Sequence, residues 1–130
     1  YISLINNEKV DGLIMTMWAD DPKWSFVGFD HLGNVNNVVE KEVISNEATV
    51  GIYNFQKGSD FVNSADQMIA KNLRVKNEFY VAPVYNEMIS NQAKIRIYNV
   101  GKEYDGMHGM GIPSDLNKFC LSKNSIKAIK

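Results

Sequence analysis

The chain has 130 residues, of which 45% are hydrophobic and 22% charged, and its formal net charge is −1. This length fits one domain with a sizeable core, and this composition is ordinary for a globular protein. The near-neutral charge gives no support for a nucleic-acid or anionic-membrane partner, and no apolar run reaches the roughly 20 residues of a membrane span. The single cysteine, Cys120, excludes an intrachain disulfide and fits a reducing, cytoplasmic setting.

The first three predicted strands lie in the N-terminal third of the chain. Residues 12–18 are apolar and rich in β-favouring types, which predicts a buried strand. Residues 24–29 and 35–42 are two further runs of this kind, separated by a short turn that contains Gly33. A short glycine-containing turn between two strands is typical of a β-hairpin, so we expect these two runs to pair.

A fourth strand and a helix follow the hairpin. Residues 48–55 predict the strand, and Ser59 is a good N-cap with Asp60 placed to complement the helix dipole. Apolar residues then recur at spacings of three and four, which predicts one apolar helical face. These residues are Phe61, Ala65, Met68, Ile69 and Leu73.

The second half of the chain again mixes helices and strands. A helix is expected across residues 81–89, beginning close to Pro83, because proline is tolerated only near the first turn. Residues 94–100 alternate apolar and polar side chains, which predicts a strand. Residues 101–111 show no clear period, and residues 113–121 predict a last short helix that opens on proline.

Residues 122–130 form a polar, basic tail that we expect to fray. The rest of the chain, residues 1–121, contains strands and helices in mixed order with one clear hairpin. This order predicts an α/β domain whose mixed sheet is covered by helices.

Glu40 and Lys41 close one predicted strand, and Gly51 interrupts the next. A carboxylate accepts hydrogen bonds from hydroxyl groups, an ammonium group holds a phosphate as a point charge, and a strand glycine lets a ligand approach the backbone. Together the three residues suit a phosphorylated, hydroxyl-rich ligand. An exposed charge pair beside a strand glycine is the alternative interpretation of the same residues.

Five motifs follow one another in the chain: WSFVGFD at 24–30, VVEK at 38–41, ISNEATVGIY at 44–53, NEFYVAPVYN at 77–86 and GIPSDL at 111–116. In this order they resemble the C-terminal half of the sugar-phosphate nucleotidyltransferase family. The chain is similar to glucose-1-phosphate thymidylyltransferases, and more so to a branch found in bacterial capsule and surface-polysaccharide clusters. The resemblance covers roughly residues 10–121.

The resemblance implies part of a three-layer α/β/α nucleotide-diphospho-sugar transferase fold with a mixed sheet. It implies a reaction in which a nucleoside triphosphate and a sugar 1-phosphate give a nucleotide-activated sugar and pyrophosphate. Mg²⁺ and cationic side chains would hold the charge that develops, so catalysis would consist mainly of positioning and electrostatics. The implied partners are the nucleoside triphosphate and a phosphorylated small-molecule acceptor, with no nucleic acid and no membrane.

The resemblance also assigns four substrate-binding residues. Glu40 matches the glutamate that accepts hydrogen bonds from sugar hydroxyls, and Lys41 matches the lysine that binds the sugar phosphate. Gly51 matches a position where the backbone approaches the sugar. Ser25 falls where relatives often carry a glycine, and its side chain would crowd or re-aim the substrate, so the acceptor class stays open. Some relatives activate phosphocholine or other phosphorylated small molecules.

The sequence departs from the family pattern in two places. It contains no glycine-rich phosphate-binding loop with an arginine, so we expect the N-terminal half of the domain, with its nucleotide site, to be absent. This chain alone would then be inactive and would hold no catalytic residue. Gly109 stands where relatives carry a metal-binding aspartate, so the metal ligands within this chain are unknown. The main Mg²⁺ ligand is expected in the N-terminal half of the domain.

These departures leave a second function open, a non-catalytic ligand-binding or assembly module derived from the same fold. An open sheet without its first half would expose an edge and apolar surface, so we expect pairing with the missing half or with a second copy of the chain. The nucleobase and the identity of the acceptor are left open, because base-reading residues belong to the other half.

The remaining candidate residues have structural interpretations. His31 lies in the hairpin turn and is expected to be exposed, and His108 is expected to be structural. Two distant histidines and one cysteine do not have metal-site spacing. We expect Cys120 to be a small buried hydrophobe. The acidic pair at 20–21 is expected to form a solvated turn, and Glu78 to serve capping and packing.

Overall fold

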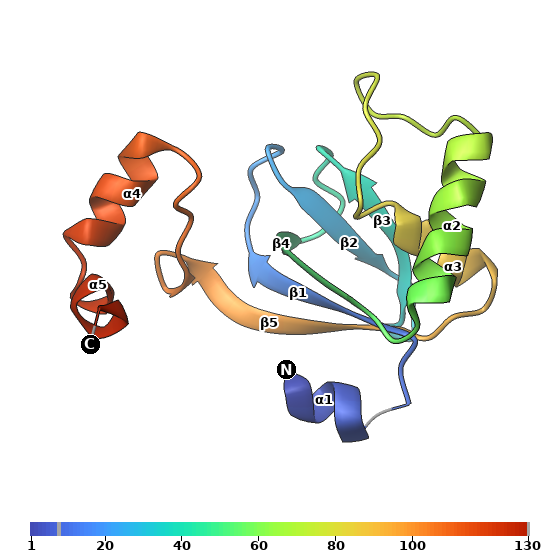
Figure 1. The fold of residues 1–130 in the computed structure, drawn as a ribbon, viewed down its shortest axis with the longest axis horizontal. Helices are drawn as coiled ribbons and strands as arrows, with labels where there is room; N and C mark the ends of the chain where they lie inside the picture. The colour runs from blue at the N-terminus through green and yellow to red at the C-terminus, as the bar shows by residue number, and fades with distance from the viewer. Residues whose placement is uncertain (8, 130) are drawn as a thin grey trace.

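The computed structural model describes residues 1–7 and 9–129, so Glu8 in the predicted domain and Lys130 in the predicted tail lie outside the described residues. The described chain forms one six-stranded mixed sheet in the order β3-β2-β4-β1-β5-β6 (Figure 1). The α/β class and the mixed sheet expected from the sequence are therefore confirmed. The strands are β1 (Gly12–Trp18), β2 (Ser25–Phe29), β3 (Val35–Glu40), β4 (Glu47–Phe55), β5 (Ile95–Glu103) and β6 (Gly106–Met107).

The central strand β1 has neighbours of opposite direction. It pairs antiparallel with β4, from Gly12 opposite Phe55 to Trp18 opposite Glu47. On its other side it pairs parallel with β5, from Gly12 opposite Ile95 onward. The predicted hairpin is also present, since β2 and β3 pair antiparallel. The two outer strands of the described sheet are therefore β3 and β6.

Helices α2 (Gly58–Ala70) and α3 (Val84–Ser90) lie together against one face of the sheet, as Figure 1 shows. The core on this side is the larger one, and Tyr85 of α3 is fully buried in it. Phe26 and Val27 are neighbours in β2 and therefore face opposite sides of the sheet, where each joins a different cluster. The first cluster contains Ile14, Val27, Val35, Val38, Ala82, Tyr85, Met88 and Ile95, and the second contains Met17, Ala19, Phe26 and Ala48.

The edge strand β3 is closed by a side chain from α3. The Asn86 amide accepts a hydrogen bond from the Val38 N–H at 2.7 Å and donates one to the Val38 carbonyl at 2.8 Å. One side chain thus supplies the donor and the acceptor that a further strand would supply. This contact fixes β3 two residues before Glu40.

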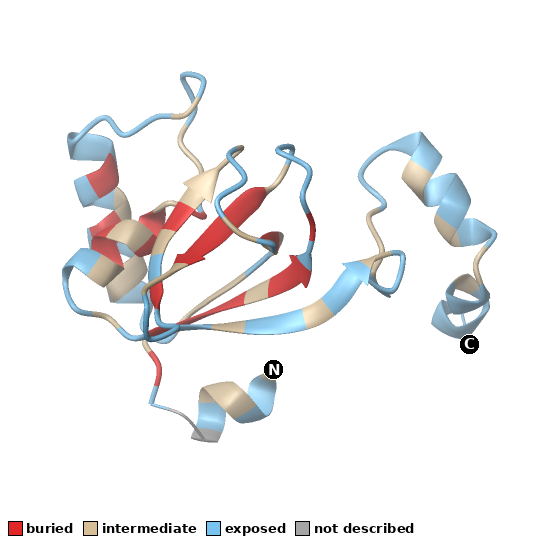
Figure 2. Ribbon diagram, turned by 180° about the vertical axis from the view of Figure 1, so that it is seen from behind, coloured by how far each residue is buried: buried red, intermediate tan, exposed pale blue. Residues whose placement is uncertain are grey.

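The remaining helices lie at the two ends of the chain. Helix α1 (Ile2–Asn7) follows Tyr1, whose hydroxyl donates to the Leu13 carbonyl at 3.2 Å and whose ring meets the Tyr98 ring edge-on. Helices α4 (Pro113–Cys120) and α5 (Lys123–Ala128) lie beyond the end of β5, apart from the body of the sheet (Figures 1 and 2). Neither α4 nor α5 contains a buried residue.

Two predictions about the C-terminal part are wrong. The tail expected to fray instead forms α5 over residues 123–128, because the Ser122 side chain caps it by accepting from the Ser125 N–H. Cys120 is exposed instead of buried, because α4 does not pack on the sheet. The segment 101–111 without a clear period contains the end of β5 and the short strand β6.

The first long helix also begins earlier than expected. Lys57 is its N-cap, with extended backbone and no side-chain cap, so Ser59 lies inside the first turn. Met68 of the predicted apolar face is buried, whereas Ile69 and Leu73 are half exposed. The other helix on this face starts at Val84 with Pro83 as its N-cap, close to the position that the proline predicts. Among the described residues, no helix is long and apolar enough to cross a membrane.

Candidate functional site

Three of the four predicted substrate-binding residues line one cavity of about 300 Å³. Ser25 comes from the start of β2, Glu40 from the end of β3, and Gly51 from the middle of β4. Lys41 follows Glu40 and contacts Tyr80, which lines the same cavity. The complete lining is Lys23, Trp24, Ser25, Glu40, Thr49, Val50, Gly51, Tyr53, Tyr80, Val81 and Ala82.

Ser25 and Glu40 are opposite partners across the β2–β3 hairpin. The Ser25 hydroxyl donates a hydrogen bond to Oε2 of Glu40. This cross-strand pair orients the carboxylate, and Ser25 is itself 7% exposed. The Ser25 side chain, which the sequence predicts to crowd the substrate, therefore binds the Glu40 carboxylate instead.

Gly51 lies in an irregular part of β4. Between Thr49 and Tyr53 this strand advances four residues, whereas its partner β1 advances two, from Thr16 to Ile14. Gly51 has φ +81°, a left-handed conformation that favours glycine, and a Cβ placed on it would meet no atom within 4 Å. The bulge therefore needs a glycine for its backbone conformation and leaves open space beside it.

A group of hydroxyls lies beside the Glu40 carboxylate. The Thr49 and Tyr53 hydroxyls lie 2.8 Å apart, within hydrogen-bond distance across the bulge. Burial raises the pKa of Tyr53, while hydrogen bonding to Thr49 and Ser25 works in the opposite direction. Tyr53 therefore keeps its proton at neutral pH, and the lining of the cavity includes the Glu40 carboxylate together with the hydroxyl groups of Ser25, Thr49 and Tyr53.

Lys41 does not line the cavity itself, but its backbone and its side chain each bind a residue that does. Its backbone has φ 60°, and its N–H donates to the Trp24 carbonyl at 3.0 Å. Its ammonium donates to the Tyr80 hydroxyl at 2.9 Å and lies 4.9 Å from the centre of the Tyr80 ring. The hydrogen bond to Tyr80 raises the pKa of Lys41, so the side chain stays positively charged.

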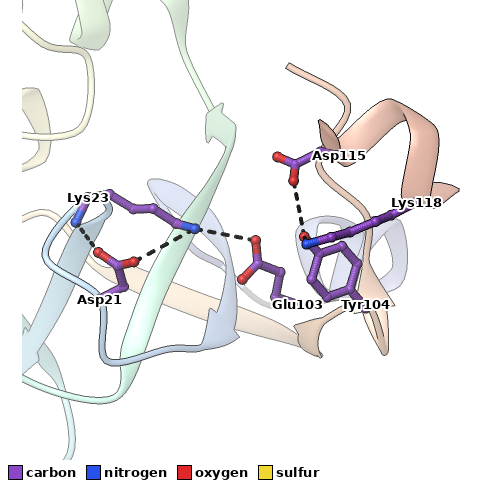
Figure 3. A network of polar contacts seen from close by, with 6 residues as sticks. All are labelled: Asp21, Lys23, Glu103, Tyr104, Asp115 and Lys118. Atoms are coloured by element: carbon purple, nitrogen blue, oxygen red, sulfur yellow. Dashed lines mark hydrogen bonds and ion pairs between the residues drawn. The ribbon is translucent and has the colours of Figure 1, made fainter. Parts of the chain in front are cut away.

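Lys23 is a second cation at the cavity, and its charge is already paired. Its ammonium lies 3.4 Å from Glu103 and 3.8 Å from Asp21, as Figure 3 shows. Asp21 also accepts the backbone N–H of Lys23 at 2.9 Å, which places it in the expected exposed turn. Carboxylates thus neutralise Lys23, whereas the nearest partner of the Lys41 ammonium is a hydroxyl.

The sequence alone did not identify Lys23, Thr49, Tyr53 or Tyr80 as part of this site. Thr49 and Tyr53 meet only because of the bulge around Gly51. Tyr80 lies in the motif at 77–86, which was noted for its resemblance but not for a cavity.

Nowhere in the described part of the chain do three or more His, Cys, Asp or Glu side chains gather closely enough to hold a metal ion. His108 packs edge-on against Phe119, and its Nε2 lies 2.9 Å from the Asn124 amide. A Cβ added at Gly109 would lie 3.6 Å from the Asp115 carboxylate. The described residues do not by themselves fit a Mg²⁺ site.

The comparisons with known proteins place the fold. No family model matches the chain, and no curated protein matches it. Among solved structures, a nucleoside-diphosphate-sugar pyrophosphorylase from Vibrio cholerae RC9 is similar over 94% of this chain, with a TM-score of 0.81 and 23% identity. The chain has part of the nucleotidyltransferase fold.

Two further solved structures agree with the nucleotidyltransferase fold. A protein assigned as a glucose-1-phosphate thymidylyltransferase from Bacillus anthracis, in complex with sucrose, matches 91% of the chain with a TM-score of 0.63 and 18% identity. A CMP:2-keto-3-deoxy-manno-octonic acid synthetase in complex with CTP matches 98% of it with a TM-score of 0.51 and 11% identity. At these identities the likeness concerns the fold alone.

The chain spans about half the length of the solved structures that it matches. It covers 50% of the Vibrio cholerae protein, 45% of the Bacillus anthracis protein and 53% of the synthetase. The expectation that it corresponds to part of a nucleotidyltransferase fold is therefore confirmed.

Proposed function

We propose that this chain is the acceptor-binding half of a nucleotidyltransferase. The complete enzyme would transfer a nucleoside monophosphate from a nucleoside triphosphate to a sugar 1-phosphate or a similar phosphorylated small molecule, and release pyrophosphate. The observation that carries this proposal is the cavity in which the Glu40 carboxylate lies among hydroxyl groups, with the Lys41 ammonium bound to Tyr80 of the cavity lining. We assign the product to surface-polysaccharide precursor synthesis in the cytoplasm.

The cavity wall suits an acceptor with several hydroxyl groups. An ionised carboxylate only accepts hydrogen bonds, whereas serine, threonine and tyrosine hydroxyls both donate and accept. Oε2 of Glu40 is occupied by Ser25, and the described residues provide no hydrogen bond to Oε1. Oε1 is the oxygen that we assign to a ligand hydroxyl. The exposed backbone at Gly51 gives the ligand room to lie against β4.

The acceptor phosphate is assigned to Lys41. An ammonium group binds phosphate as a compact point charge, and Lys41 carries its charge to high pH because its pKa is raised by Tyr80. Lys23 is less suited, since its ammonium is shared by Asp21 and Glu103. Binding at Lys41 would fix the acceptor phosphate oxygen for attack and leave its hydroxyls directed at Glu40.

The chemical step needs positioning and charge stabilisation instead of a covalent protein nucleophile. A phosphate oxygen of the acceptor forms a bond to the α-phosphorus of the nucleotide, and the bond from that phosphorus to the β-bridging oxygen breaks. Pyrophosphate leaves with the bonding electrons. Mg²⁺ would supply electrostatic stabilisation of the phosphates, with ligands beyond the residues described in this structure.

The test uses protein expressed from its complete coding sequence. Pyrophosphate release is measured across nucleoside triphosphates and phosphorylated acceptors, with Lys41→Met compared to Lys102→Met, a change at an exposed lysine of β5. Loss of a charge-assisted phosphate contact should lower kcat/KM for the acceptor by about 10- to 150-fold. Lys102→Met should match the wild type.

Two outcomes would reject or redirect the proposal. If Lys41→Met and Lys102→Met give the same kcat/KM, Lys41 does not bind the acceptor phosphate. If the protein binds phosphorylated sugars tightly but releases no pyrophosphate with any nucleotide, it is a ligand-binding module with this fold.

A further inference from the structure

Lys41 belongs to a short relay that continues away from the cavity. Its ammonium donates to the Tyr80 hydroxyl at 2.9 Å, and that hydroxyl donates to Oε2 of Glu78 at 2.6 Å. The two bonds fix the direction of the hydroxyl, because its single proton goes to Glu78 and a lone pair faces Lys41. Glu78 thus determines which side of the Tyr80 oxygen is offered to the ammonium.

Glu78, the last residue of this relay, belongs to a tight turn that begins at Val75. Val75 and Glu78 exchange both backbone hydrogen bonds at 3.0 Å, and the two residues between them have positive φ. This is the geometry of a tight two-residue hairpin turn. Arg74 braces the turn by donating to the Asn77 carbonyl at 3.0 Å and by lying 3.9 Å from the centre of the Phe79 ring.

Tyr80 also lines two cavities. One is the candidate acceptor cavity and the other is a second cavity of about 280 Å³, and Glu40 lines both as well. A lysine side chain has four rotatable bonds and loses much freedom when it is fixed. The Tyr80 contact therefore fixes this ammonium beside a residue that lines both cavities.

We propose that Tyr80 is a positioning residue that holds the Lys41 ammonium ready for the acceptor phosphate, and that Glu78 orients Tyr80 for this task. The inference rests on the proposed function of Lys41. It makes phosphate affinity depend on a hydroxyl that does not itself bind the phosphate. The charged and titratable groups around the Lys41 ammonium are Tyr80, Glu40 and Glu78, and the hydrogen bond that the ammonium donates to Tyr80 has the largest influence on its pKa.

The first measurement needs no ligand. The lysine side chains are labelled with ¹³C at Cε, and the Lys41 signal, identified by its loss in Lys41→Met, is titrated by NMR in wild type and Tyr80→Phe. We expect the Lys41 pKa to fall toward its ordinary value in Tyr80→Phe. An unchanged Lys41 titration would overturn the inference and leave the proposed function intact.

A matched control exists elsewhere in the chain. Lys118 donates to the Tyr104 hydroxyl at 3.1 Å, and that hydroxyl donates to Asp115 at 3.1 Å, as Figure 3 shows. The hydrogen bond to Tyr104 likewise raises the pKa of Lys118. Tyr104→Phe should therefore shift the Lys118 signal and leave both the Lys41 signal and ligand binding unchanged.

The second measurement is binding of glucose 1-phosphate and of glucose to the protein from its complete coding sequence, by calorimetry. Tyr80→Phe should weaken glucose 1-phosphate binding by about 3- to 10-fold and leave glucose binding unchanged. Glu78→Ala should also weaken glucose 1-phosphate binding. Glu78→Gln keeps an acceptor oxygen for the Tyr80 hydroxyl, so it should lose much less affinity than Glu78→Ala.

Double variants separate positioning from direct contact. In the Lys41→Met background, Tyr80→Phe should cause no further loss of glucose 1-phosphate affinity. A further loss would mean that Tyr80 contacts the ligand itself, and would overturn the positioning role. If Lys41→Met binds glucose 1-phosphate as the wild type does, the proposed function of Lys41 fails, whatever the NMR titration shows.

Discussion

Asn86 in α3 binds both backbone groups of Val38 in the edge strand β3, at 2.7 and 2.8 Å. Val38 is 1% exposed, so neither group has water as an alternative partner. The same contact fixes β3 just before Glu40. Two residues separated by 48 positions in the chain thus join the helical layer to the strand that carries the candidate site.

Asn86→Ala should destabilise the fold strongly. It leaves a buried N–H and a buried carbonyl without a partner, which should lower the free energy of unfolding by about 2–4 kcal/mol. Asn86→Asp keeps an acceptor and loses the donor, so the free energy of unfolding of this variant should lie between those of the wild type and Asn86→Ala. Urea unfolding of the three proteins measures this order, and equal stability of Asn86→Ala and wild type would contradict it.

Gly51→Ala should be destabilising through backbone conformation alone. A Cβ at this position meets no atom within 4 Å, but φ is +81°. The left-handed conformation should cost about 1–2 kcal/mol for alanine. Gly58→Ala is the control, since Gly58 also has open space and no positive φ. If both variants have the same stability in urea, backbone strain at Gly51 is not what selects glycine.

Tyr85 should make the fold sensitive to alkaline pH. Burial raises its pKa above the ordinary value of 10.0, and its hydroxyl donates to the Asn54 carbonyl at 2.8 Å. The folded state therefore keeps the proton to higher pH than the unfolded state does. The stability from this group is fully present below pH 10.0 and is lost as pH rises further, by about 1.4 kcal/mol per pH unit.

Thermal unfolding between pH 8 and pH 12 tests this linkage. Tyr85→Phe should be less stable at neutral pH by about 1–3 kcal/mol, because the Asn54 carbonyl loses its donor. It should also show a shallower decline above pH 10 than the wild type. Tyr98→Phe, which removes a more exposed hydroxyl, should keep the wild-type decline. Parallel curves for Tyr85→Phe and wild type would show that Tyr85 does not cause the alkaline loss.

Lys71 and Glu87 should be coupled energetically. The Lys71 ammonium at the end of α2 lies 2.5 Å from the Glu87 carboxylate in α3, whose side chain is 6% exposed. Lys71→Met leaves this carboxylate buried without a cation. Because Lys71 itself is 54% exposed, water replaces part of the contact, and we expect a loss of about 1–3 kcal/mol.

The double variant is the decisive comparison for this pair. Glu87→Gln in the Lys71→Met background removes the buried charge and should recover part of the lost stability. Lys102→Met should have no effect within about 0.5 kcal/mol. Additive effects of the Lys71 and Glu87 substitutions would show that the two side chains do not depend on each other.

The strands were the most predictable part of the fold. Alternation and β-favouring residues located β1, β2, β3 and β4 to within a few residues, and the hairpin followed from its turn. Asp30 stabilises that turn by accepting the backbone N–H groups of Leu32 and Asn34 at 2.9 and 2.8 Å. A local pattern suffices for the hairpin because β2 and β3 follow each other in the chain and pair, whereas β1 pairs with β4 and β5, which lie further along the chain.

The helix ends and the C-terminal segment were less predictable. Ser59 has the chemistry of an N-cap, but the N-cap of α2 is Lys57, two residues earlier, although its side chain makes no capping hydrogen bond. Ser122 has the same chemistry and does cap a helix, α5, where a frayed tail was expected. Cap residues thus indicate that a helix is near without fixing where it begins.

The candidate site was predictable only in part. Glu40, Ser25 and Gly51 were assigned from motifs, and the structure brings all three to one cavity. Tyr53 joins them through a bulge, and Tyr80 through a turn far along the chain, so neither followed from spacing. The roles of these residues stay predictions until binding is measured.

The parallel pairing of β1 with β5 bears on how the chain is made. Asp11 accepts the backbone N–H of Lys94, 83 residues further on, so this pairing closes a long loop. During synthesis the β2–β3 hairpin and the β1–β4 pair can form first, and the edge of β1 that later pairs with β5 stays unpaired until then. Closure of this loop should limit the folding rate. A nascent chain stalled before Ile95 would expose the buried strand that carries Leu13 and Ile14, and would be a target for chaperones or aggregation.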